Sequence, residues 1–282
     1  MSWLRNGVSL FPDARRPIRI RHSAMTAHRH DSPAIVAEWV KALEARHLSE
    51  LRVSELTRAL RALSTAYVGR GTNGVKNALE GAGKRAAFAL FYAPLHFLAT
   101  YFIVQALEAD AAPPRAILDI GCGTGVAGAA WAIAGGGTAA VTGIDRHPWA
   151  VAEAGWTYRA LHINGRARQG DLARLPPLSP GTAVVAAYVL NELPDPLREQ
   201  VHTRLVDAVR GGARLLIIEP ISRKVTPWWA GVAAHIAKAG GRAEEWRFAV
   251  DLPEPLPLLD RAAGLDHRAI TARSLYCPGH VG

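Results

Sequence analysis

The stretch ILDIGCGTG, residues 117–125, decides the fold of this chain. Its apolar first half has the composition of a buried strand, and Gly121, Gly123 and Gly125 allow a tight turn in which a ligand can lie against bare main chain. A helix that begins directly after such a turn presents unpaired backbone N–H groups to the same ligand. The stretch therefore predicts a nucleotide-type cofactor site at the end of a strand.

Short apolar strands and helices alternate downstream of this turn. The expected strands cover residues 116–120, 139–145, 166–169, 183–189, 214–219 and, last in the chain, 268–275. The expected helices cover residues 126–134, 148–161, 196–209, 228–238 and 256–263. Such alternation predicts an α/β fold with a parallel sheet, helices on both of its faces, and ligands beyond the carboxyl ends of the strands. We expect this Rossmann-like domain to span residues 112–282.

The residues before a linker at 111–114 have a helical pattern instead. Ser32–Pro33 is a typical helix start, and apolar residues follow at helical spacing up to about residue 46. A second helix is expected from Ser54, and no strand is expected before residue 111. The prediction is an all-helical N-terminal region over residues 32–111.

One helical stretch needs a membrane test. Residues 86–107 contain no formal charge and are long enough to cross a bilayer. However, Pro94 and several polar side chains interrupt the stretch, and proline suits the first turn of a helix. We therefore expect two buried helices that separate near Tyr92–Pro94, and no membrane partner.

The net charge of +9 is unevenly distributed along the chain. Residues 1–30 contain six arginines and one aspartate, so they carry +5 of it. Residues 1–31 are therefore expected to be a basic flexible tail, which is either a phosphate-binding arm or an unfolded leader before Met25. The two cysteines, Cys122 and Cys277, exclude a disulfide framework and a cysteine-rich metal site, and they fit a cytoplasmic protein.

Acidic residues fall beside the glycine turn and after the next two strands. Asp119 lies two residues before the first glycine, and Asp145 ends the second strand. Asp171 and Leu172 follow the third strand. The glycine spacing departs from the dinucleotide fingerprint, because Val126 stands where that pattern has its last glycine. Asp145 would still suit the ribose of a nicotinamide nucleotide, so a dehydrogenase is the alternative.

The pattern D-x-G-x-G-x-G after an apolar strand resembles motif I of the class I S-adenosylmethionine-dependent methyltransferases. This resemblance implies S-adenosyl-L-methionine as the cofactor, with its methionine part over the three glycines. It also implies that Asp119 fixes the turn or meets the amino group. Asp145 would hold the ribose, and Asp171 with Leu172 the adenine.

The fourth strand leads into YVLNELPD, residues 188–195, at the strand end that faces the methyl group in enzymes of this class. Asn191 or Glu192 could orient or deprotonate a nucleophile there. Alternatively, Asn191 caps the turn and Glu192 is merely exposed. Further along, basic residues beside Trp228 and Trp229 could hold a phosphate and a base, or the tryptophans could pack inside the protein.

A narrower resemblance covers roughly residues 33–222. KRAAFALFYAP (residues 84–94), motif I, YVLNELP (188–194) and IIEP (217–220) resemble the mitochondrial small-ribosomal-subunit methyltransferase-like family and its bacterial relatives. That family implies a helical region before the methyltransferase fold, and ribosomal RNA or the assembling small subunit as partner. The family's downstream cysteine cluster is missing here, so no iron–sulfur cofactor is expected.

The favoured function is therefore methyl transfer to ribosomal RNA or to a target associated with the small subunit. A small-molecule methyltransferase with a helical lid is one alternative, favoured by the modest charge outside the tail and by an aromatic helical roof. The other is a catalytically silent assembly factor that only binds the cofactor. The expected aromatic residues of the roof are Phe88, Phe91, Tyr92, His96, Phe97 and Tyr101.

Overall fold

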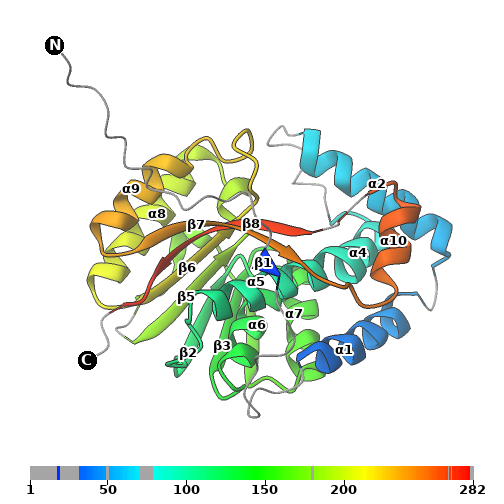
Figure 1. Ribbon diagram of the computed structural model, residues 1–282, viewed down its shortest axis with the longest axis horizontal. Coiled ribbons are helices and arrows are strands. Elements are labelled where there is room, and N and C mark those ends of the chain that lie inside the picture. Colours follow the sequence, from blue (N-terminus) through cyan, green and yellow to red (C-terminus); the bar gives the residue numbers. More distant parts are fainter. Residues whose placement is uncertain are drawn as a thin grey trace.

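The computed structural model describes residues 18–19, 32–48, 51–69, 79–178, 181–265, 267 and 269–279, in which one sheet is covered by helices on both faces (Figure 1). The strands are β1 (Ile18–Arg19), β2 (Ala116–Ile120), β3 (Ala140–Asp145), β4 (Gly165–Gln169), β5 (Thr182–Ala187), β6 (Arg214–Glu219), β7 (Arg242–Ala249) and β8 (Ile270–Cys277). The helices are α1 (Ser32–His47), α2 (Val53–Gly69), α4 (Ala82–Ala87), η2 (Phe88–Tyr92), α5 (Ala93–Ala106), α6 (Val126–Ala134), α7 (Pro148–Ala160), η3 (Leu172–Arg174), η4 (Leu190–Glu192), α8 (Asp195–Arg210), α9 (Trp229–Lys238) and α10 (Leu256–Ala262).

The strand order is β1-β7-β8-β6-β5-β2-β3-β4. Strands β2 to β6 are parallel, whereas β8 runs antiparallel between β6 and β7. The expected Rossmann-like α/β class is confirmed, and a helical region precedes its central strands. Because β2 and β5 are neighbours whose flanking connections leave in opposite directions, ligands are expected beyond their carboxyl ends.

Two strands differ from the sequence-based expectation. Residues 242–249 were assigned no strand, yet β7 forms there and buries Trp246 and Phe248 on one face. The expectation of no strand before residue 111 is also wrong, because Ile18–Arg19 pairs with Phe248–Ala249 of β7 in parallel. The physical reason is that the outer side of β7 offers unpaired backbone groups, which any extended segment can satisfy. The rest of the expected tail lies outside the described residues.

The expected break near Pro94 does not occur. Helices α4, η2 and α5 form one continuous helix, Ala82–Ala106, with a π-helical turn at η2. In that turn the N–H of Ala93 donates to the carbonyl oxygen of Phe88, five residues earlier. A proline lacks an N–H and clashes with a carbonyl of the preceding turn. The wider π turn accommodates Pro94 without ending the helix.

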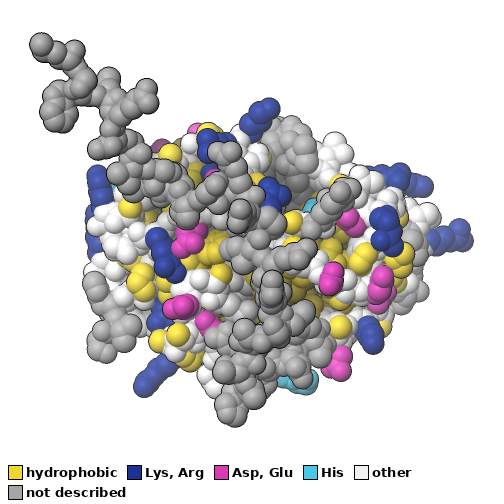
Figure 2. Space-filling view, viewed as in Figure 1, with side chains coloured by type: hydrophobic (Ala, Val, Ile, Leu, Met, Phe, Trp, Pro, Cys, Tyr) yellow, Lys and Arg dark blue, Asp and Glu magenta, His cyan; other side chains and the backbone are white. Residues whose placement is uncertain are grey.

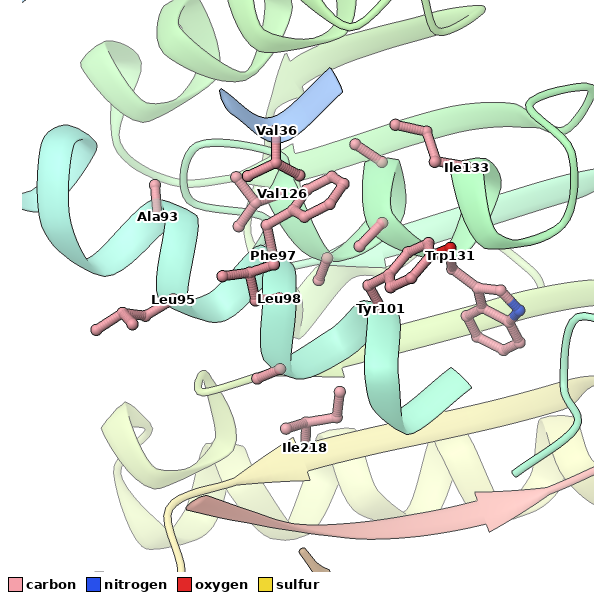
Figure 3. Close-up of a cluster of buried hydrophobic side chains, with 14 of the residues drawn as sticks. Val36, Ala93, Leu95, Phe97, Leu98, Tyr101, Val126, Trp131, Ile133 and Ile218 are labelled. Atoms are coloured by element: carbon pink, nitrogen blue, oxygen red, sulfur yellow. The ribbon is translucent and has the colours of Figure 1, made fainter. Parts of the chain in front are cut away.

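Within the described residues, the helix Ala82–Ala106 is the one long and apolar enough to cross a membrane by length and composition. The protein itself buries 78% of its most apolar window. Its side chains pack against the sheet domain, as Figure 3 shows for Phe97 and Tyr101 of α5 beside Val126 and Trp131 of α6. The hydrophobic core on this side of the sheet therefore runs without interruption from the N-terminal helices into α6 and α7.

A buried carboxylate fastens α1 to the sheet domain. Glu153 of α7 is 1% exposed, and its oxygens lie 3.2 Å from Nε of Arg46 and 2.7 Å from Nε2 of His47. The Arg46 guanidinium also lies over the Trp156 ring, 5.0 Å from its centroid. These contacts fix the N-terminal helices against α7, because a buried carboxylate is costly without such partners.

Candidate active site

The glycine turn after β2 has the geometry that its sequence predicts. Gly121, Gly123 and Gly125 have φ angles of 63°, 51° and 80°, in the left-handed region that favours glycine. A Cβ on Gly121 would lie 2.2 Å from Cγ2 of Val189, so the turn passes directly against the loop after β5. Gly121 and Gly123 still line the cavity described below, whereas Gly125 packs against the ring of Tyr158.

Asp119, in β2, is 1% exposed and fixes the start of α6. Its Oδ2 accepts a hydrogen bond from the N–H of Gly128 at 2.8 Å. No partner is found for its Oδ1 among the described residues. Burial raises the pKa of Asp119 to about 7, and the nearby charge of Asp145 adds to this rise. The side chain therefore fixes the start of α6 and keeps one oxygen for a further donor, while its predicted role toward the turn or the amino group stays a prediction.

Asp145, at the end of β3, connects the glycine turn to α7. Its Oδ2 accepts from the N–H of Gly123 at 2.9 Å, and its Oδ1 accepts from the N–H of His147 at 2.8 Å. Each carboxylate oxygen has two lone pairs, so both oxygens can still accept a ribose hydroxyl. The position of Asp145 fits the predicted role, which stays a prediction.

Asp171 and Leu172 lie where β4 leads into η3. The Oδ1 of Asp171 accepts from the N–H of Ala173 at 2.9 Å, while Leu172 is buried. The N–H of Gly170 donates to the carbonyl oxygen of Asp145 at 2.9 Å, which brings this segment beside the end of β3. An exposed carboxylate next to a buried leucine suits an adenine ring and its amino group.

A cavity of about 1120 Å³ opens beyond these strand ends. It brings together eight of the nine predicted site residues, since Gly125 alone does not line it and turns toward the ring of Tyr158 instead. A single ligand pocket usually measures about 300–1,000 Å³. The cavity therefore has room for a cofactor and a second molecule. The eight residues in its wall are Asp119, Gly121, Gly123, Asp145, Asp171, Leu172, Asn191 and Glu192.

The continuous helix Ala82–Ala106 roofs one half of the cavity. Phe88, Tyr92 and His96 line it at a spacing of four residues, which places them on one helix face. The other three aromatic residues expected in the roof do not line the cavity and are buried in the core. Three of the six expected roof residues therefore line the cavity and give this part of its wall an aromatic character, while the role of the roof stays a prediction.

Tyr188 is a cavity residue that sequence analysis did not single out. It follows β5 with a φ of 57°, and its ring stacks on His96 with centroids 3.9 Å apart. Burial lowers the pKa of His96 to about 3 and raises that of Tyr188. Neither ring therefore exchanges a proton readily near neutral pH. The pair forms a flat, uncharged wall at the carboxyl end of β5.

Asn191 and Glu192 both line the cavity on η4. The N–H of Asn191 donates to Oε1 of the fully buried Glu219 at 3.2 Å, which joins η4 to the end of β6. The Oδ1 of Asn191 is buried without a hydrogen-bond partner among the described residues. An amide cannot accept the proton of a nucleophile near neutral pH, so Asn191 can orient an acceptor but not deprotonate it.

His267 and Asp260 form a second feature that sequence analysis missed. Nδ1 of His267 lies 2.5 Å from Oδ1 of Asp260, and the backbone N–H of His267 donates to Oδ2 at 2.9 Å. His267 lines the cavity between α10 and β8. No motif spacing connects the two residues, and only the adjacent acid in the sequence DHR hints at a polar site.

Negative charge dominates the described lining of the cavity. It contains four carboxylates, those of Asp119, Asp145, Asp171 and Glu192, whereas Arg146 is the one Lys or Arg. On the face that Figure 2 shows, basic and acidic side chains of the described residues are interspersed rather than gathered into a basic patch. The described site therefore offers little attraction to a polyphosphate.

The tryptophan pair packs inside the protein. Trp229 is 8% exposed, and the Arg273 guanidinium lies 4.6 Å from its ring centroid. Arg198 lies in the same way over Trp228, at 5.3 Å. Neither tryptophan lines the cavity. Of the two alternatives for this pair, packing is the one confirmed. Among the described residues, no group of three or more His, Cys, Asp or Glu side chains is placed to hold a metal ion.

The fold and this site can now be compared with known proteins. Residues 117–212 match the profile of a family described as a methyltransferase domain. The chain therefore carries a class I S-adenosylmethionine-dependent methyltransferase domain, and its cofactor is S-adenosyl-L-methionine. The dehydrogenase alternative has no support. The matched family is a general methyltransferase domain and gives no support for the narrower ribosomal family. That resemblance therefore remains a prediction.

Three solved structures illustrate the similarity. Magnesium protoporphyrin IX methyltransferase from Synechocystis PCC 6803, with bound S-adenosylhomocysteine, is 20% identical, with a TM-score of 0.43 over 64% of this chain and 82% of that one. The N-methyltransferase NodS from Bradyrhizobium japonicum WM9 is 15% identical, with a TM-score of 0.45 over 64% and 87%. Mitomycin 7-O-methyltransferase is 16% identical, with a TM-score of 0.48 over 87% and 75%. The comparison with curated proteins gives no match.

The residues present fit this cofactor. The turn at 121–125 exposes main chain, and the Oδ1 of Asp119 is a buried acceptor without a partner among the described residues. A carboxylate oxygen in that state suits the ammonium group of a methionine moiety, because buried polar groups are normally paired. Asp145 and Asp171 follow at the ends of the next two strands, in the order that a ribose and an adenine require.

Proposed function

We propose that this protein transfers the methyl group of S-adenosyl-L-methionine to a small aromatic molecule bound under the helical roof. The observation that carries this proposal is that two chemically different sets of residues line the 1120 Å³ cavity. Glycines and carboxylates lie at the ends of β2, β3 and β4, and we call this part the cofactor half. Aromatic rings lie on the roof helix and directly after β5, and we call this part the aromatic half. The two parts adjoin where the ring of Phe88 approaches Gly123.

The aromatic half supports a flat apolar acceptor. Phe88, Tyr92 and the stacked pair of His96 and Tyr188 present ring faces and edges, which favour another ring at stacking or edge-to-face distance. Each such contact contributes about 0.5–1.5 kcal/mol beyond the burial of area. The roof helix covers one side of an acceptor bound there, which removes water from that side.

The charge of the lining favours a small molecule over ribosomal RNA. RNA carries one negative charge per nucleotide, and proteins that bind it rely on Lys and Arg near the phosphates. The described lining contains one arginine against the carboxylates of Asp145, Asp171 and Glu192 and the partly protonated Asp119, so its net charge is negative and repels a polyanion. Ribosomal RNA is the second candidate, because the family resemblance and the arginines of residues 1–30 favour it.

The bound cofactor supplies a methyl group that is already activated by its sulfonium. The protein then has to bind, align and desolvate the acceptor. In this proposal the bare turn and Asp119 hold the methionine part, Asp145 the ribose, and Asp171 with Leu172 the adenine. The roof places the acceptor against the end of β5, next to Asn191.

A methyl-transfer assay with tritiated S-adenosylmethionine tests the proposal. The purified protein is offered a panel of hydroxy- and amino-aromatic compounds, a metabolite extract and isolated small ribosomal subunits. We expect label in the small-molecule fraction and none in RNA. If label enters RNA alone, ribosomal RNA and not a small molecule is the acceptor. If no acceptor is labelled, a cofactor-binding assembly factor is the favoured function.

Matched variants show whether the label depends on the proposed site. Asp145→Ala removes the carboxylate beside Gly123, and we expect the transfer rate to fall at least about tenfold, as for a lost charge-assisted hydrogen bond. Asp207→Ala removes an exposed carboxylate on α8, outside the cavity, that pairs with Arg210, so it should leave the rate unchanged. Equal labelling by the wild-type protein and Asp145→Ala would overturn the ribose assignment.

A further inference from the structure

The pair of His267 and Asp260 has the construction of a base held in one orientation. Asp260 is 7% exposed, and both of its carboxylate oxygens are used by His267, one by the ring and one by the backbone N–H. The ring of Phe91 packs edge-on against the imidazole, with centroids 5.4 Å apart. The imidazole therefore has a fixed position.

The orientation also determines which ring nitrogen is available. A carboxylate next to Nδ1 favours the tautomer with the proton on Nδ1, so Nε2 keeps a lone pair. The side chain of His267 is 36% exposed, and it forms part of the cavity wall. Asp260 occupies the other side of the ring. The lone pair on Nε2 is therefore the part of His267 left for a molecule in the cavity.

His267 lies in the cavity wall beside the roof helix. Its ring contacts Phe91 of η2, and α10, which carries Asp260, contacts the roof helix at η2. Its neighbours in the wall are Ile270 and Thr271 at the start of β8. Figure 1 shows α10 next to α4 on the same side of the molecule. His267 is therefore next to the part of the cavity that the proposed function assigns to the acceptor.

The other titratable groups in this half of the cavity are poorer bases. Burial holds the pKa of His96 near 3, so its imidazole accepts a proton only in strong acid. Burial raises the pKa of Tyr92 to about 12 and raises that of Tyr188, so both phenols stay protonated. Asn191 has no basic group, and the carboxylate of Glu192, next to it on η4, belongs to a class of side chain that is ordinarily a weaker base than an imidazole. His267 is the one described imidazole here that carries a carboxylate partner.

We propose that His267, oriented by Asp260, is the general base for the methyl transfer, and that the acceptor is an aromatic hydroxyl compound. This inference rests on the proposed function and adds its acceptor class. Nε2 of His267 accepts the hydroxyl proton, and the freed oxygen lone pair forms the new C–O bond to the methyl carbon. The electron pair of the broken C–S bond stays on sulfur, and the proton leaves the imidazole for water after the product departs.

The acceptor class follows from what a histidine can deprotonate. Histidine is the usual general base near neutral pH, and it deprotonates a phenol, whose pKa is about 10, more readily than it does a less acidic hydroxyl group. An aliphatic alcohol is far less acidic, and an amine that is already neutral needs no base. The aromatic wall selects a ring for the same position. Together these two features favour a phenol or an enol on a flat ring.

The first test measures ionisation rather than turnover. 4-Nitrophenol absorbs at longer wavelength when it is ionised, so it reports its own protonation state. We would add it to the wild-type protein saturated with S-adenosylhomocysteine, at a pH about one unit below the pKa of the free probe. The expected result is a phenolate band on binding, because His267 takes the proton.

Variants assign that proton to His267. His267→Gln should bind 4-nitrophenol without the phenolate band, and Asp260→Asn should weaken the band. His235→Gln, which changes an exposed histidine on α9 outside the cavity, should leave it intact. A wild-type complex without the band, a probe that does not bind, or a band that persists in His267→Gln would each overturn the proposal.

The second test uses rate constants for the acceptors that the methyl-transfer assay identifies. His267→Gln should lower kcat about 10²–10⁴-fold for an acceptor of high pKa, and progressively less as the acceptor pKa falls, because an ionised acceptor needs no base. Imidazole in solution should restore part of the rate of His267→Ala. A merely structural role would lower the rate equally for all acceptors and without rescue, which would contradict the proposal.

Calorimetry with S-adenosylhomocysteine separates this proposal from the proposed function. His267→Gln should take up that compound with the affinity of the wild-type protein, because His267 lies outside the cofactor half. If the wild-type protein bound neither the cofactor nor any acceptor, the proposed function itself would fail. If methyl transfer to a phenol occurred equally with and without His267, only the base assignment would fail.

Discussion

Replacing Asp119 by asparagine should change how the stability of the protein depends on pH. Asp119 is 1% exposed, and burial raises its pKa from the usual 3.8 to about 7. The folded protein therefore binds this proton more tightly than the unfolded chain does. As the pH rises from about 4 to about 7, the folded state is progressively destabilised relative to the unfolded state.

The magnitude follows from the two pKa values of Asp119. Each pH unit between them is worth about 1.4 kcal/mol, so the whole effect reaches about 4 kcal/mol. Asparagine keeps an oxygen for the N–H of Gly128 but cannot ionise. We therefore compare the free energies of unfolding of the two proteins. The value for Asp119→Asn minus the value for the wild-type protein should rise by about 2–3 kcal/mol between about pH 5 and about pH 8.

Urea denaturation of both proteins at the two pH values measures this difference. All other titrating groups cancel to first order, because the two proteins share them. Asp207→Asn is the matched control, because the Asp207 carboxylate is exposed on α8. The free energy of unfolding of this variant minus that of the wild-type protein should not change with pH. A flat difference for Asp119→Asn, or one that falls as the pH rises, would refute the buried, proton-holding state of Asp119.

Two further predictions concern packing. Gly125→Ala should lower the free energy of unfolding by about 1–3 kcal/mol more than Gly136→Ala, because both glycines have positive φ but only at Gly125 would a Cβ meet the Tyr158 ring, at 2.8 Å. Equal losses in urea denaturation would show that the turn can relax. Glu153→Ala should lower the free energy of unfolding by about 1–3 kcal/mol, because it removes the carboxylate that pairs with two α1 side chains. The control Glu199→Ala, at an exposed position, should change the free energy of unfolding by less than about 0.5 kcal/mol. A thermal shift no larger for Glu153→Ala than for its control would contradict the role of that cluster.

The cofactor half of the site could be predicted from sequence because it is built locally. The strand β2, the glycine turn and α6 follow one another in the chain, and glycine adopts the dihedral angles of such a turn at the lowest cost. Asp145 and Asp171 line the same cavity as the turn because parallel strands bring their carboxyl ends to one edge of the sheet. Each of these inferences uses a short stretch of sequence and a general rule of α/β folds.

The acceptor half could not be predicted in the same way, because it depends on distant segments. Strand β7 mixes charged and apolar residues, and its partners β8 and β1 lie at opposite ends of the chain. The stacking of His96 on Tyr188 joins the roof helix to the end of β5. The pair of His267 and Asp260 has no sequence periodicity, because a loop after α10 brings the two side chains together. Pro94 was misinterpreted as a break because a π turn leaves no periodic signal in the sequence.

Calorimetric titration tests the central claim most directly, namely that the glycine turn and Asp145 hold S-adenosyl-L-methionine. We predict that one molecule binds per chain, that Asp145→Ala weakens binding at least about tenfold, and that NAD does not bind. Uptake of NAD in place of S-adenosylmethionine, or an affinity that Asp145→Ala leaves unchanged, would contradict the account.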